Sequence, residues 1–208
     1  MPSVIDICNM ALSRCGNSER INDLDEASTQ AEQCQLFYEL SRDFVLRDHA
    51  WGFARAFVEL PQLDTNPDPQ FAYAYAVPID CLKIRGLVNT VWPPIDWPFC
   101  DSLPPRIPEI AYRVINAASN QAIATNVSPA VLDYTIKVEN PQMFDPIFVS
   151  ALAWYLAGQI APAVARDAGI ATTCLQQYAA EILRAAAADL NENQTSYQRE
   201  SDFITVRG

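Results

Sequence analysis

Proline is concentrated in the middle of this chain. Eleven of the 15 prolines lie between Pro61 and Pro129, and the whole sequence has only six glycines. Proline lacks a backbone N–H, so it is disfavoured inside helices and in central strands. The placement predicts helical segments on both sides of a middle region made of short strands and turns.

Composition limits the class of protein. The 208 residues are 50% hydrophobic and 19% charged, which excludes a collagen-like chain and a fully disordered one. The length suits one domain, or one domain that carries an inserted subdomain. Lysine and arginine number 14 against 25 aspartates and glutamates, which gives a net charge of −11. Such an acidic chain is not expected to wrap nucleic acid, because phosphates require facing cations.

Two amphipathic helices are expected in the first 50 residues. The first begins after Ser3 as N-cap and ends near Cys15, with Gly16 in the left-handed conformation that often follows a helix. The second spans about residues 29–48. Apolar residues at helical spacing predict its core face: Ala31, Cys34, Phe37, Tyr38, Ser41, Phe44 and Val45.

The middle of the chain predicts short strands. Large and small residues alternate in Phe71–Val77, which is typical of a strand with its aromatic side chains on one face. Pro78–Asp80 is expected to form a turn, and residues 92–108, with six prolines, an irregular surface loop. The expected strands are 53–60, 71–77, 81–88 and 131–138, together with a hairpin of 110–115 and 121–125.

The helical pattern resumes at Asp145, an N-cap residue followed by Pro146 at the first helical position. Pro162 is expected to kink or end this helix, because it removes a backbone donor. A last helix is expected at about residues 172–190. Its predicted core face is formed by Leu175, Tyr178, Ala179, Ile182, Leu183 and Ala186.

The segment 147–165 has no charged residue and approaches the length that crosses a bilayer. Alanine is more frequent in it than leucine, and Ser150, Gly158, Gln159 and Pro162 interrupt it. We therefore expect a central helix buried by other helices, with Trp154 and Tyr155 in the core. A membrane span is the alternative.

The cysteines and the single histidine do not suggest a metal centre. The six cysteines stand at positions 8, 15, 34, 81, 100 and 174, without a CxxC pair. Cys8, Cys15, Cys34 and Cys174 are expected to be reduced and buried in helix faces. His49 is expected to contact solvent in the last turn of the second helix, where the negative end of the helix dipole stabilises a positive charge.

We find no catalytic or cofactor motif in the sequence. The phosphate-binding patterns GxGxxG and GxxxxGK[ST] and the nucleophile elbow GxSxG are absent. Carboxylates cluster at residues 23–26, 64–68 and 192–200, in segments that we interpret as loops or tails carrying solvated charge. The prediction is therefore no catalytic residue, no cofactor and no bound metal.

Two segments are candidates for partner binding. Trp92 and Trp97 lie in the sequence WPPIDWPF, where they either cover an edge of the β region or meet a partner, since tryptophan is enriched at interface hot spots. The chain ends with a polar tether followed by the apolar residues Phe203, Ile204 and Val206. This tail is interpreted either as disordered or as a strand that adds to a partner's sheet.

Several short motifs follow one another in an order that is similar to a known family. They are Ala11–Gly16, Arg42–Leu46, Trp51–Ala54, Tyr75–Leu82 with Arg85, Leu132–Tyr134, Phe144–Phe148 and Ala151–Ala157. In this order they resemble the head-to-tail adaptor proteins of short-tailed bacteriophages, also called tail tubular protein A or tail accessory factor. The resemblance covers about residues 3–190 and rests on the order of these motifs.

The resemblance implies an α+β fold. A bundle of about four helices would be built from residues 1–50 and 141–192, interrupted by a β-rich subdomain at 51–140. An extended tail would follow at 193–208. In such adaptors the C-terminal segment often reaches the portal, which makes Phe203, Ile204 and Val206 candidates here.

The resemblance also implies a structural, non-enzymatic virion protein. It would be made in the host cytoplasm and located at the head–tail junction. A dodecameric ring would lie between the portal protein and the tail nozzle protein, with DNA passing through its lumen unbound and no contact with a membrane. The alternative is a head-completion connector of a long-tailed phage. An enzyme of unknown type and a membrane protein are the rivals from other classes.

Overall fold

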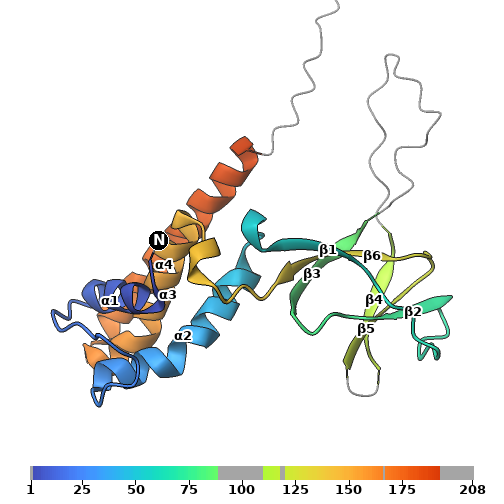
Figure 1. Cartoon of the computed structure of the whole chain (residues 1–208). Helices are drawn as coiled ribbons and strands as arrows, with labels where there is room; N and C mark the ends of the chain where they lie inside the picture. The colour runs from blue at the N-terminus through green and yellow to red at the C-terminus, as the bar shows by residue number, and fades with distance from the viewer. Residues whose placement is uncertain (1, 89–109, 118–119, 166, 193–208) are drawn as a thin grey trace, which may run out of the picture.

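The computed structural model describes residues 2–88, 110–117, 120–165 and 167–192 (Figure 1). In this part of the chain, helices from both ends flank a middle of short strands, so the predicted α+β fold is confirmed. The helices are α1 (Val4–Arg14), α2 (Thr29–Asp48), α3 (Pro146–Val164) and α4 (Ala168–Glu192). The strands are β1 (Arg55–Glu59), β2 (Tyr73–Ala76), β3 (Cys81–Val88), β4 (Tyr112–Ala117), β5 (Asn120–Thr125) and β6 (Val131–Ile136).

The helix caps lie where their residue types predict them. The Ser3 hydroxyl accepts a hydrogen bond from the Asp6 N–H, and the Asp6 carboxylate accepts one from the Ser3 N–H, which forms a capping box on α1. Gly16 follows this helix with φ of 78°. The Asp145 carboxylate accepts from the Ile147 N–H and caps α3. These three positions confirm the sequence predictions.

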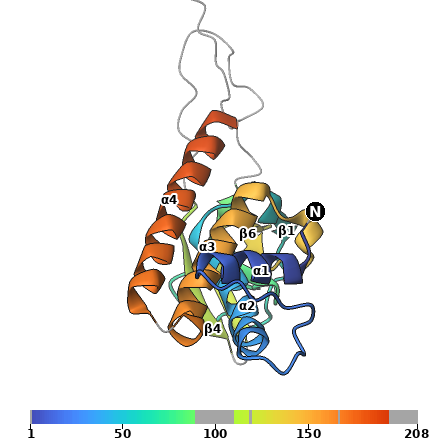
Figure 2. The same ribbon diagram turned by 90° about the vertical axis from the view of Figure 1, so that its left-hand side faces the viewer.

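Helix α3 is the centre of the bundle, and α1, α2 and α4 all pack against it. Figure 2 shows α1, α2 and α4 arranged around α3. This helix is long and apolar enough to cross a membrane, yet just over half of its apolar window is buried inside the molecule. The prediction of a central buried helix is confirmed. Pro162 lies in the last turn, and α3 continues for two residues beyond it.

The strands form two small antiparallel sheets with the orders β1-β6-β3 and β2-β5-β4. The predicted hairpin is confirmed as β4 and β5, with Ala117 opposite Asn120. A second hydrophobic core lies in this region, and its largest fully buried members are Tyr75, Ile123 and Leu132.

Trp51 joins the helices to the strands. Its indole Nε1 donates to the Val45 carbonyl at the end of α2, and its ring meets Phe148 of α3 edge-on at 5.1 Å. The Trp51 carbonyl accepts a hydrogen bond from Arg85 of β3, and the same guanidinium donates to the Thr135 hydroxyl of β6. A buried tryptophan therefore bonds to an element on each side.

Several predicted boundaries differ from the structure: the strands expected at 71–77 and 131–138 are shorter, at Tyr73–Ala76 and Val131–Ile136, and two further differences have a local cause. The strand expected from residue 53 begins at Arg55, because Gly52–Ala54 form a 3-10 turn under Trp51. The last helix begins at Ala168, four residues earlier than expected, where the Asp167 carboxylate accepts from the Gly169 N–H. The division into regions 1–50, 51–140, 141–192 and 193–208 stays a prediction.

Candidate interaction surfaces

The predicted partner-binding residues Trp92, Trp97, Phe203, Ile204 and Val206 all lie outside the described residues. The surfaces that can be built residue by residue come instead from α2, α4 and the two sheets. Sequence analysis did not select them, because it placed several of their apolar side chains in the core.

The first surface is an apolar stripe along α2, formed by Leu36, Leu40 and Phe44. Their exposed fractions are 59%, 66% and 45%. Because they stand four residues apart, they lie above one another on one helix face, over a length of about 12 Å. The prediction that Phe44 belongs to the core face is wrong. The rest of the predicted face is largely confirmed, since five of its residues are buried together with Arg42 and Leu46: Ala31, Cys34, Tyr38, Ser41 and Val45.

Phe44 takes part in an aromatic contact between three helices, the aromatic seam, formed by Phe44 of α2, Tyr155 of α3 and Tyr178 of α4. Its ring stacks on Tyr155 of α3, with centroids 4.5 Å apart and planes at 10°. Tyr155 in turn meets Tyr178 of α4 at 5.1 Å. The α2 stripe therefore begins at a packed aromatic seam and extends outward from it through Leu40 to Leu36.

The second surface is a stripe along α4, formed by Leu175, Ala179 and Leu183. Leu175 is 39% exposed and Leu183 is 72% exposed, and Ala179 is also exposed. All three were predicted to face the core: this is wrong for Ala179 and Leu183, whereas the Leu175 side chain lies against Gly158 of α3. The side of α4 that is buried carries Cys174, Tyr178 and Ala185.

Two polar contacts set the rotation of α4 about its axis. Tyr178 donates its hydroxyl to the Asp48 carboxylate at 2.5 Å. Nε2 of His49 is hydrogen-bonded to Oδ2 of Asp189 at 2.7 Å. Burial, and then the hydrogen bond to Asp48, raise the pKa of Tyr178. Both contacts orient the Tyr178 side of α4 toward the end of α2.

His49 is not the solvent-facing residue that its position predicted. Its side chain is only 13% exposed, and its ring packs edge-on against Trp51 at 4.8 Å. A pocket of about 130 Å³ lies beside this contact, lined by Trp51, Phe53, Asp189 and their neighbours. The histidine therefore has a packed, hydrogen-bonded position between two helices.

Trp154 is also less buried than predicted. It packs against the bundle core but is only partly buried, and the Arg14 guanidinium lies 4.2 Å from the centre of its ring. Arg14 donates to both the carbonyl and the hydroxyl of Ser150. A wider polar groove of about 750 Å³ runs along α1 beside this arginine.

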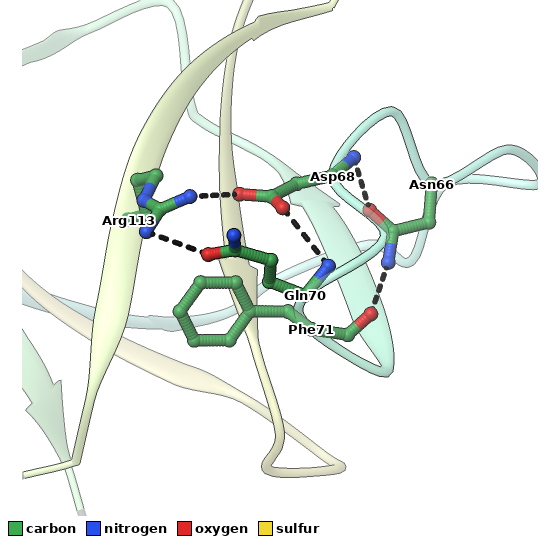
Figure 3. A network of polar contacts seen from close by, with 5 residues as sticks. All are labelled: Asn66, Asp68, Gln70, Phe71 and Arg113. Atoms are coloured by element: carbon green, nitrogen blue, oxygen red, sulfur yellow. Dashed lines mark hydrogen bonds and ion pairs between the residues drawn. The ribbon is translucent and has the colours of Figure 1, made fainter.

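The end of the second sheet carries a polar network, drawn in Figure 3. Arg113 of β4 donates to the Asp68 carboxylate at 2.9 Å and to the Gln70 side-chain carbonyl at 3.0 Å. Asn66 donates to the Phe71 carbonyl and accepts from the Asp68 N–H. Asp68 is buried, so its interpretation as solvated loop charge is wrong. The network fastens the loop before β2 to β4.

The outer strands of both sheets also carry exposed apolar side chains. They are Phe57 on β1 and Val114 on β4, and Ile79 is almost fully exposed in the turn before β3. Beside Phe57, Arg55 binds both oxygens of Asp133. These positions are scattered singly, unlike the regular spacing along α2 and α4.

The described cysteines behave as small hydrophobic residues. Cys8, Cys15, Cys34 and Cys174 are buried and free, as predicted. Burial raises the pKa of Cys15 to about 12. Within the described ranges, no group of three or more histidine, cysteine, aspartate or glutamate side chains could hold a metal ion.

The geometry thus offers apolar helix faces as the leading candidate site. No protein-family model matches the chain, and no curated protein matches it.

Proposed function

We propose that this chain is a structural head-to-tail adaptor of a phage virion, which forms a ring between the portal and the tail nozzle. The proposal begins from the order of motifs described above, from Ala11–Gly16 to Ala151–Ala157. The α+β fold, with helices from both ends of the chain around a β-rich middle, agrees with what that resemblance implies.

The observation that carries the proposal is the apolar surface of the helices. Leu36, Leu40 and Leu183 are each more than half exposed. Monomeric proteins rarely expose large contiguous apolar patches. A regular row of exposed apolar side chains therefore indicates a surface that a partner covers. An assembly protein accounts for these rows directly, since each copy needs neighbours.

The charge distribution supports a ring through which DNA slides. The net charge is −11, so DNA phosphates meet a surface that repels them. Several of the few cations are engaged by protein groups: Arg14 by Ser150, Arg55 by Asp133 and Arg113 by Asp68. Such a protein can line a DNA channel without holding the DNA.

The direct test mixes the purified protein with the portal protein of the same virion. We expect negative-stain images to show a ring seated on the portal, and a gel-shift assay to show no DNA binding at physiological salt. A protein that neither binds the portal nor forms a ring on it would refute the proposal. Tight binding to DNA would contradict the free passage of DNA through the lumen.

A further inference from the structure

We propose that two buried pairs of cysteines form disulfides when the chain meets an oxidant, and that these links fasten α1 to α2 and to α4. Cys8 of α1 pairs with Cys34 of α2, and Cys15, which caps the end of α1, pairs with Cys174 of α4. The inference does not rest on the proposed function, because it is argued from contacts inside a single copy.

Cys8 and Cys34 contact each other between α1 and α2. Both are fully buried and free, and their thiols are hydrogen-bonded to one another. This shared hydrogen bond raises the pKa of Cys8 and lowers the pKa of Cys34, because the Cys8 thiol stabilises a Cys34 thiolate. Since the thiolate is the nucleophile in disulfide chemistry, Cys34 is the more reactive member of this pair.

Cys15 and Cys174 meet where the end of α1 lies against α4. The Cys174 sulfur is 3.9 Å from the Arg14 carbonyl oxygen, directly beside Cys15. The Cys15 thiol donates to the Ala157 carbonyl of α3 at 3.2 Å, and it is also in hydrogen-bond contact with the Cys174 thiol. A disulfide has an S–S length of about 2.0 Å, so it forms most readily between thiols that already touch.

Helix α1 is the element whose opening would expose these thiols. It has 11 residues and packs mainly on α3, with much less contact to α2 and α4. Buried groups react during local opening, and weakly held elements open most often. Burial raises the pKa of Cys15 to about 12 while the bundle is closed, and this protection ends when α1 separates. The thiols are therefore attacked while α1 is open and linked when it closes.

The oxidant is a low-molecular-weight disulfide, RSSR. A cysteine thiolate attacks one sulfur of RSSR, the S–S bond breaks, and the leaving RS⁻ takes up a proton to become RSH. When α1 closes, the thiolate of the second cysteine attacks the protein sulfur of this mixed disulfide and releases a second RSH. Each link therefore transfers two electrons and two protons from the cysteines to the oxidant.

The two links respond to the redox state of the surroundings. A reducing cytoplasm keeps thiols free, whereas disulfides persist in oxidising environments. The link between Cys15 and Cys174 encloses most of the chain, and a longer enclosed loop restricts the unfolded state more strongly. Oxidation is therefore expected to stabilise the helical bundle and to hold α1 in place.

The test treats the purified full chain, without portal, with hydroxyethyl disulfide and then blocks the remaining thiols with N-ethylmaleimide. Peptide mapping without reductant is expected to find Cys8 linked to Cys34 and Cys15 linked to Cys174. The thermal midpoint is expected to rise by about 5 °C or more, and to return to its original value after dithiothreitol.

Cys34→Ala and Cys174→Ala are the matched variants, because each leaves α1 unchanged and removes one partner thiol. Each is expected to lose its own link and to keep the other. Circular dichroism melts show whether the variants are folded, and the map of the wild-type chain decides the question where a variant is not.

Two results would overturn the proposal. One is the absence of either link in the folded wild-type chain, under conditions in which the chain unfolded in urea reacts completely. The other is a map that pairs these four cysteines differently, or a thermal midpoint that does not rise. Because no portal is present, these outcomes are distinct from success or failure of the adaptor function.

Discussion

Nε2 of His49 lies 2.7 Å from Oδ2 of Asp189, and this contact ties the end of α2 to the last turns of α4 across 140 residues of sequence. The histidine side chain is mostly buried, whereas the carboxylate is 37% exposed. Removing the carboxylate leaves a packed imidazole without its partner. The free energy of unfolding lost by leaving the imidazole unpaired exceeds what an exposed ion pair contributes.

We expect Asp189→Ala to lower the free energy of unfolding by roughly 1–2 kcal/mol. Urea denaturation at pH 7 measures this change. His49→Ala and the double variant complete a double-mutant cycle, which isolates the pair from the packing of the imidazole on Trp51. A coupling energy near zero would mean that the two side chains do not support one another.

The buried thiol of Cys15 predicts alkaline instability. Its ordinary pKa of 9.0 rises to about 12 in the folded chain because the thiol is buried. A raised pKa means that the folded state keeps its proton while the unfolded state loses it. The contribution of this thiol to the free energy of unfolding is therefore fully present below pH 9. It falls by about 1.4 kcal/mol per pH unit as the pH rises from 9 toward 12.

Urea midpoints at pH 7, 9 and 10 measure this dependence, and Cys15→Ala is the matched variant. We expect the variant to lose less stability than the wild type between pH 9 and 10. Tyr38 adds to the decline only above its ordinary pKa of 10.0, because burial raises its pKa to about 12. Identical slopes for variant and wild type would exclude Cys15 as the cause.

Phe148 and Trp154, two aromatic residues of α3, are expected to differ in their contribution to stability. Phe148 is fully buried among Trp51, Phe53 and Phe144. Phe148→Ala should therefore cost about 3–5 kcal/mol. Trp154 is partly exposed and holds the Arg14 guanidinium, so Trp154→Ala should cost about 2 kcal/mol. Denaturant midpoints compare the two, and a larger loss for Trp154 would place it in the core after all.

The C-terminal residues are expected to act in docking rather than in folding. Deleting residues 202–208 removes Phe203, Ile204 and Val206, and the buried members of both hydrophobic cores in the described part of the chain lie between Ile7 and Ala185. We expect an unchanged thermal midpoint and weaker binding to the portal, measured by co-sedimentation. Binding equal to that of the full chain would refute a docking role for the tail.

Local signals in the sequence predicted helix ends and strand positions well. Ser3, Gly16 and Asp145 act through their immediate neighbours, so each can be interpreted without knowing the fold. Strand β3 likewise has the predicted bounds, Cys81–Val88. Such features depend on contacts within about five residues, which a single sequence contains.

The rotation of α4 could not be predicted in the same way. Apolar residues at helical spacing lie on two of its sides, one with Leu175 and Leu183 and the other with Cys174 and Tyr178. Periodicity does not choose between them. The choice depends on Asp48, which is 130 residues from Tyr178 in sequence. The candidate stripes became visible only when that contact was known, and Asp68 with Arg113 is a second case of the same kind.

The central place of α3 has a consequence for synthesis of the chain on the ribosome. Helices α1 and α2 pack mainly on α3 and much less on each other, so the first 48 residues have little to fold against alone. About 100 further residues must be translated before α3 emerges, which takes roughly 5–20 s at about 5–20 residues per second. During that interval the apolar faces of α1 and α2 stay exposed to chaperones and to other nascent chains.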